Sequence, residues 1–218
     1  MALELFLTDL DGTTVQYAGP FQSTWDAIGA HLPQADKWTQ MRDYYLHLPL
    51  KSHEWEQCER EMLRGNNARF IFEKILPPPY TPGFQECMHY LKKKGVVRGI
   101  LSSGVDHIAH YIAQDCELDF VVCNEVHVQD GIFMGTGVTH VGMEQKGEWA
   151  ERIMKEYGFR KDETAHCGDH FNDVPVWKKV GIRVGVNLKR KELAEHVDVQ
   201  VTDFFEVQEY LKRRWYNL

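Results

Sequence analysis

A chain of 218 residues is long enough for one large domain, or for a core domain that carries a modest insertion. Its composition, 43% hydrophobic and 26% charged, is ordinary for a globular protein. The net charge of −7 argues against broad electrostatic binding to nucleic acid or to an anionic membrane, so a phosphate group must be bound at a focused local site.

The first predicted element is a short apolar run over residues 3–7, which ends at the charged sequence Thr-Asp-Leu-Asp-Gly. This pattern predicts a buried strand followed by a loop. The same segment has no basic region and too short an apolar stretch for an export signal. No later segment approaches the length of a membrane span, so we expect no membrane partner.

Residues 15–79 differ in composition from the rest of the chain, because they are rich in aromatic residues with charged residues between them. Helical spacing relates Trp55, Cys58, Met62 and Leu63, which favours a helical insertion. Three prolines at residues 77–79 form a stiff boundary at its end.

After residue 80, predicted helices and strands alternate. Thr81 is the predicted N-cap of a helix, with Pro82 as its first residue, and Gly95 ends that helix. Asp130-Gly131 between two apolar runs is a strong hairpin signal. Further strands are predicted at 96–101, 120–123, 164–167, 182–186 and 197–201, with helices at 105–113, near 149–157 and elsewhere between the strands. The alternation predicts an α/β fold with a Rossmann-like parallel sheet, an inserted helical cap and a small β-hairpin.

The five cysteines are odd in number and show no Cys-x-x-Cys spacing. We expect them to be reduced and mostly buried, as in a cytoplasmic protein.

Two aspartates, Asp9 and Asp11, follow the first predicted strand. Ligands of such sheets bind beyond the carboxyl ends of the strands. One carboxylate can attack phosphorus to give an acyl phosphate, and a second acid beside it can protonate the leaving oxygen. We assign the first role to Asp9 and the second to Asp11. Taken alone, two aspartates that cap a turn are the commoner explanation of this pair.

A second acidic cluster, Gly-Asp-His-Phe-Asn-Asp, follows the strand predicted at 164–167. Asp169 and Asp173 offer the oxygen ligands that Mg²⁺ prefers, and with Asp9 they could hold one ion. Asn172 can orient Asp9 or bind the phosphate. In isolation, this sequence is as easily a helix N-cap and a turn.

The remaining candidates would bind the phosphate oxygens. The Ser102 hydroxyl and the backbone N–H groups of Ser103 and Gly104 lie between a predicted strand and a helix, where anions are often bound. Lys146 could neutralise the charge shared by Asp9 and the phosphate. A capping serine and a solvated lysine are the alternatives for these two residues.

Taken together and in this order, these motifs resemble the haloacid dehalogenase (HAD) superfamily, most closely its phosphoserine phosphatase-like branch. The resemblance covers most of the chain outside the insertion. The residues at the family's motif positions are Asp9, Asp11, Ser102, Lys146, Asp169, Asn172 and Asp173. The resemblance implies a Rossmann-like core at residues 1–14 and 80–218, and a helical cap at residues 15–79. It also implies Mg²⁺ held by Asp9, Asp169 and the backbone carbonyl of Asp11, with Asp173 acting through water.

The resemblance further implies a phosphatase for small phosphate monoesters, because dehalogenases of the superfamily lack the second aspartate that Asp11 supplies. Phosphoserine phosphatases carry a glutamate that receives the substrate ammonium, but this chain has Ala18 at the matching position. The family also has a cap arginine for the substrate carboxylate; Arg60 and Arg64 lie near its position, but the strict register falls on Met62. The substrate, the role of His170 and the oligomeric state stay open. Transfer to a small alcohol and a non-catalytic binding module are the alternative functions.

Overall fold

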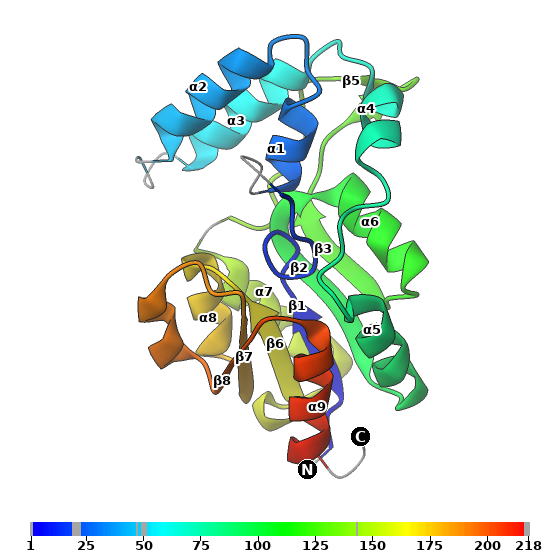
Figure 1. Cartoon of the computed structure of the whole chain (residues 1–218), viewed down its shortest axis with the longest axis vertical. Coiled ribbons are helices and arrows are strands. Elements are labelled where there is room, and N and C mark those ends of the chain that lie inside the picture. Colours follow the sequence, from blue (N-terminus) through cyan, green and yellow to red (C-terminus); the bar gives the residue numbers. More distant parts are fainter. Residues whose placement is uncertain (1, 19–22, 47, 49–51, 143, 216–218) are drawn as a thin grey trace.

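The computed structural model describes residues 2–18, 23–46, 48, 52–142 and 144–215. A six-stranded sheet with the order β3-β2-β1-β6-β7-β8 forms its centre, and every neighbouring pair in it is parallel (Figure 1). Its strands are β1 (Leu5–Thr8), β2 (Val97–Val105), β3 (Phe120–Asn124), β6 (Thr164–Gly168), β7 (Ile182–Val186) and β8 (Val199–Val201). When these six strands are numbered 1 to 6 along the chain, their order in the sheet is 3-2-1-4-5-6, the order of the Rossmann fold. After strand 1 the chain builds the sheet first toward one edge and then, from strand 4, toward the other edge. The predicted parallel α/β fold is confirmed.

Helices cover both faces of the sheet, because alternate residues of its strands are apolar on both sides. Phe6 of β1 packs in the larger hydrophobic cluster, whereas Leu5 and Leu7 pack in a second cluster on the opposite face. Helices α5 (Phe84–Lys93), α6 (Asp106–Asp115) and α9 (Phe204–Arg214) contribute to the first cluster, and α7 (Lys146–Tyr157) and α8 (Val174–Trp177) to the second. Short 3₁₀ turns η2 (Lys161–Glu163), η3 (Phe171–Asp173) and η4 (Lys191–His196) connect the later elements.

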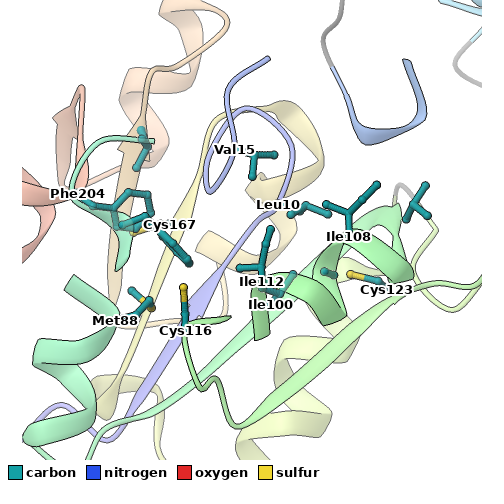
Figure 2. Close-up of a cluster of buried hydrophobic side chains, with 14 of the residues drawn as sticks. Leu10, Val15, Met88, Ile100, Ile108, Ile112, Cys116, Cys123, Cys167 and Phe204 are labelled. Atoms are coloured by element: carbon teal, nitrogen blue, oxygen red, sulfur yellow. The ribbon is translucent and has the colours of Figure 1, made fainter. Parts of the chain in front are cut away.

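The larger cluster also contains most of the cysteines. Figure 2 shows Cys116, Cys123 and Cys167 among aliphatic side chains that include Ile100 and Ile112. Four of the five cysteines are buried and all five are free thiols. Here the thiols act as small hydrophobic side chains, as expected from the sequence.

Between β1 and α5 the chain forms helices that stand above the carboxyl ends of the strands (Figure 1). These helices are α1 (Thr24–Gly29), α2 (Ala35–Tyr45), α3 (Ser52–Leu63) and α4 (Ala68–Ile75). Ser23 caps α1 by accepting the Asp26 N–H, and Asn67 caps α4 by accepting the Phe70 N–H. The expected helical character of residues 15–79 is therefore found over their described part.

The predicted hairpin consists of β4 (Val128–Gln129) and β5 (Ile132–Phe133). Asp130 and Gly131 have φ values of 52° and 78°. A type I′ turn requires a positive φ at both of its central residues, so these two residues suit that turn. Backbone hydrogen bonds join this hairpin to the turn between α3 and α4, from Gly65 N–H to Phe133 O (2.8 Å) and from Ala68 N–H to Gly131 O (2.8 Å). The hairpin is thus tied to the helical segment.

Two predictions about element ends are wrong. Gly83, not Thr81, is the N-cap of α5, and the Thr81 hydroxyl instead donates a 2.5 Å hydrogen bond to Thr13 O in the loop after β1. Ser102 and its two successors do not follow their strand but lie inside β2, which extends to Val105. The pairing of β2 with β3 shifts between Leu101 and Val105, so this stretch is extended but irregular.

Candidate active site

The nucleophile candidate, Asp9, follows the last residue of β1 and is only 3% exposed. A tight loop holds it in place, because Gly12 N–H bonds to Val15 O (2.9 Å) and the Thr14 hydroxyl donates to Asp9 O (2.6 Å). Gly12 has a φ of 79°, and a Cβ there would lie 2.2 Å from Asp169 Oδ2. Glycine is therefore required both for the turn and for the close approach of the two acidic loops.

Carboxylates from two strand ends meet beside this loop. One oxygen from each of Asp9, Asp169 and Asp173 lies within 4.8 Å of the other two, and all three residues are buried. Burial, followed by the charges of Asp9 and Asp173, raises the pKa of Asp169 well above its usual value. A divalent cation would relieve this repulsion, and three carboxylate oxygens form a donor set that suits a hard ion. This acidic triad therefore fits a metal ion.

Asp173 is bound by the protein on both of its oxygens. Its Oδ1 lies 2.5 Å from Lys146 Nζ, and its Oδ2 accepts the backbone N–H groups of Asp169 (2.9 Å) and His170 (3.1 Å). The carboxylate thus fixes the loop that carries Asp169, which suits a supporting position at a metal site.

Lys146, the first residue of α7, is fully buried between two of these carboxylates. Its Nζ lies 2.8 Å from Asp9 Oδ1 and 2.5 Å from Asp173 Oδ1. Burial by itself lowers the pKa of Lys146, but Asp173 and Asp9 outweigh it and raise the pKa above its usual value. The ammonium is therefore charged at any physiological pH.

The Asp11 carboxylate is bound by Thr24, the first residue of α1. Its Oδ1 accepts the Thr24 N–H at 2.7 Å, and its Oδ2 accepts the Thr24 hydroxyl at 3.0 Å. Burial, followed by the charge of Asp9, raises the pKa of Asp11 to about 7. A carboxyl group with this pKa can both give and take a proton near neutral pH.

The predicted phosphate-binding stretch of β2 lies beside both catalytic candidates. Burial raises the pKa of Asp9, and the Lys146 ammonium and the buried Ser102 hydroxyl beside it lower that pKa in part. Ser103 O accepts the indole N–H of Trp25 (3.2 Å). A Cβ at Gly104 would lie 2.8 Å from Asp11 Oδ2, so this glycine admits the carboxyl group.

The other predicted binding residues differ in their surroundings. Asn172 has a buried Oδ1 with no hydrogen-bond partner among the described residues. Arg60 is buried, and its guanidinium lies 3.6 Å from Glu56 Oε2 and donates to the Thr139 hydroxyl (3.1 Å). Arg64 lies on an exposed turn, bound to Glu61 and to Met134 O. A substrate role for these two arginines stays a prediction.

An open cavity of about 800 Å³ lies between α3 and residues 135–139. Its lining includes His53, Gln57 and Arg60 on one side and Val138 and Thr139 on the other. The acidic triad does not line it, so the cavity is separate from the carboxylates described above.

Three residues beside these carboxylates, Thr24, His166 and Lys189, were not predicted from the sequence. Ser23-Thr24 ahead of an apolar run is a recognisable helix start, which could have placed Thr24 at a helix N-terminus but not against Asp11. His166 in β6 lies with Nε2 3.7 Å from Asp173 Oδ1, and Lys189 Nζ lies 3.8 Å from Asp169 Oδ2. No local pattern marks either residue.

Comparisons with known proteins agree with this geometry. Residues 6–178 match the family model of haloacid dehalogenase-like hydrolases. The phosphoserine phosphatase of Methanocaldococcus jannaschii is 32% identical over 135 residues, which are 61% of this chain and 64% of that protein. The phosphoserine phosphatase of Lactococcus lactis is 24% identical over 201 residues, 89% of each chain. The chain thus spans slightly less than two thirds of the first of these relatives.

Among solved structures, a phospho-aspartyl intermediate analogue of phosphoserine phosphatase has a similar fold. It superposes with a TM-score of 0.81 at 24% identity, over 96% of this chain and 99% of that one. No helix among the described residues is both long and apolar enough to cross a membrane.

Proposed function

We propose that this chain, which belongs to the haloacid dehalogenase-like hydrolase family, is a Mg²⁺-dependent phosphatase of small phosphate monoesters. The observation that carries the proposal is the buried Asp9 carboxylate, 2.8 Å from the Lys146 ammonium and beside a protonatable Asp11. The relatives named as phosphoserine phosphatases support the same reaction class.

Asp9, Asp169 and the backbone carbonyl of Asp11 would hold Mg²⁺, with Asp173 acting through water. When bound, the ion offsets the repulsion between carboxylates and a phosphate dianion. Lys146, Ser102 and the backbone N–H groups of Ser103 and Gly104 would bind the phosphate oxygens, with Asn172 beside them.

In the first step an Asp9 carboxylate oxygen attacks phosphorus, and the bond from phosphorus to the leaving oxygen breaks. The proton of Asp11 passes to that oxygen, so that an alcohol and an aspartyl phosphate are formed. In the second step Asp11 takes a proton from water, the water oxygen attacks phosphorus, and the Asp9 carboxylate is released with inorganic phosphate. The pKa of about 7 suits Asp11 for both transfers.

We also propose that residues 15–79 form a cap over a core of residues 1–14 and 80–218. The contact between Thr24 and Asp11 supports this division, because the start of α1 closes over the catalytic carboxyl group. A cap in this position would limit entry to small substrates and exclude bulk water. Together with the free thiols, such a metabolite-sized substrate favours a cytoplasmic enzyme.

The test is the Asp9→Asn variant, assayed for Mg²⁺-dependent phosphate release from a panel of metabolite monoesters that includes phosphoserine. We expect the variant to lose about a thousandfold or more in turnover, as the loss of a nucleophile typically causes. Asp130→Asn is the matched control, because it makes the same change in an exposed turn where asparagine is well tolerated. Near-normal hydrolysis by Asp9→Asn would refute the assignment.

A further inference from the structure

His166 is an imidazole in an otherwise apolar position. It lies in the middle of β6, is fully buried, and its Cα pairs in register with that of Leu7. Its ring meets the ring of Trp177 edge to face at 6.3 Å. Neither ring nitrogen has a hydrogen-bond partner among the described residues.

Packing alone does not explain a histidine here. The ring is fully buried, and burial disfavours the charged form of an imidazole. A neutral imidazole still carries one N–H and one lone pair, and leaving both unpaired in the interior costs free energy. Leucine would fill the same layer beside Leu5 and Leu7 without that cost. We therefore expect the imidazole to form a hydrogen bond with a neighbouring polar group.

The nearest candidate partner is Asp173, whose Oδ1 lies 3.7 Å from Nε2 of His166. An approach of about 0.7 Å would bring these two atoms to hydrogen-bond distance. Asp173 Oδ1 already contacts Lys146, and Oδ2 holds the backbone of Asp169 and His170. A fourth hydrogen bond, from His166, would fix the orientation of the one carboxylate on which the Asp169 loop and Lys146 both depend.

We propose that His166 is a positioning residue, which donates its Nε2–H to Asp173 Oδ1 and so preorganises the acidic triad for a divalent cation. This inference rests on the proposed function, because it assumes that the triad binds Mg²⁺. Residues that hydrogen-bond to metal-site carboxylates typically change metal affinity or activity about 10–100-fold when they are removed. The geometry assigns His166 to this class of residue.

The experiment measures Mg²⁺ binding to the full chain without substrate, by calorimetry and by the Mg²⁺-induced shift of the thermal midpoint. His166→Leu removes the donor and keeps an apolar side chain. We expect about tenfold or greater loss of Mg²⁺ affinity, with a thermal midpoint in EDTA that is unchanged or higher. His166→Gln, whose amide N–H can replace the ring N–H, should stay within about threefold of the parent protein.

Cys167→Ala is the matched control, because Cys167 is the next residue of β6, is equally buried and packs on the opposite face. It should lower the thermal midpoint and leave Mg²⁺ affinity unchanged. Should His166→Leu fail to fold, His166→Met tests the same loss of the donor with a more adaptable side chain.

Parent-like Mg²⁺ affinity in the apolar variant would overturn the inference, and so would a glutamine variant no better than the leucine variant. A parent protein that binds no Mg²⁺ would also overturn it. None of these measurements involves turnover, so they are distinct from the Asp9→Asn test. If the His166 variants bound Mg²⁺ as the parent protein does while Asp9→Asn lost its turnover, this inference would be wrong and the proposed function would still hold.

Discussion

Removal of the Lys146 ammonium is the sharpest test of how this site is held together. Lys146→Met keeps the aliphatic stem but leaves Asp9 and Asp173 buried without the cation that now lies 2.8 Å and 2.5 Å away. Breaking a buried ion pair by removing one partner costs about 3–5 kcal/mol. For a chain of this size each kcal/mol corresponds to about 2–4 °C, so the thermal midpoint should fall by about 6–20 °C.

The same variant should lose turnover, because Lys146 is placed to neutralise charge that accumulates on Asp9 and the phosphate. Loss of one preorganised electrostatic partner typically lowers kcat by about a hundred- to a thousandfold. Thermal denaturation by circular dichroism, with EDTA and with Mg²⁺, measures the first effect, and phosphate release measures the second. Mg²⁺ should restore part of the lost stability, because the ion offsets the same carboxylate repulsion.

Lys189→Met is the matched control for this comparison. Its Nζ lies 3.8 Å from Asp169 Oδ2, but the side chain is 43% exposed. Exposed ion pairs contribute about 1 kcal/mol or less, so the control should melt within a few degrees of the parent protein. If Lys146→Met melted as close to the parent as this control and kept most of its turnover, the electrostatic account of the site would be wrong.

Two further predictions concern Glu59 and Gly12. Burial, and then the charges of Glu56 and Asp26, raise the pKa of Glu59 well above its usual value, so the folded form keeps a proton that the unfolded chain releases. The free energy of unfolding should therefore fall as the pH rises from the usual glutamate pKa through the raised pKa of Glu59. Glu59→Gln should raise the thermal midpoint more at about pH 8 than at about pH 5. Equal increases of the thermal midpoint at both pH values would contradict this. Gly12→Ala should lower Mg²⁺-dependent phosphate release by about a hundredfold or more, because the new Cβ would lie 2.2 Å from Asp169 Oδ2. Gly65→Ala, at a similar φ of 76° with open space around it, should remain active, and equal losses in the two variants would point to backbone strain instead.

The sequence predicted the parts of this protein that depend on local pattern. The apolar run before Asp9, the alternation of strands and helices after residue 80, and Asp130-Gly131 each specify their own backbone through burial or turn geometry. A parallel sheet then brings its strand ends to one edge, which is why Asp9 and Asp169 could be predicted to meet.

Side-chain partners that come from distant segments could not be predicted in this way. Thr24 binds Asp11 only because α1 folds back over the loop after β1. Nothing near Asp173 in the sequence indicates that its carboxylate joins Lys146 to the Asp169 loop, or that His166 lies beneath it.

The sequence by itself therefore determined the sheet, the hairpin and the set of charged residues at the strand ends, since these follow from short-range periodicity and chain connectivity. Only the tertiary structure decided which carboxyl group is protonatable and which lysine is buried. Those properties depend on burial and on neighbouring charges, such as the carboxylates 2.5 Å and 2.8 Å from Lys146 Nζ, which come together when segments far apart in the chain pack.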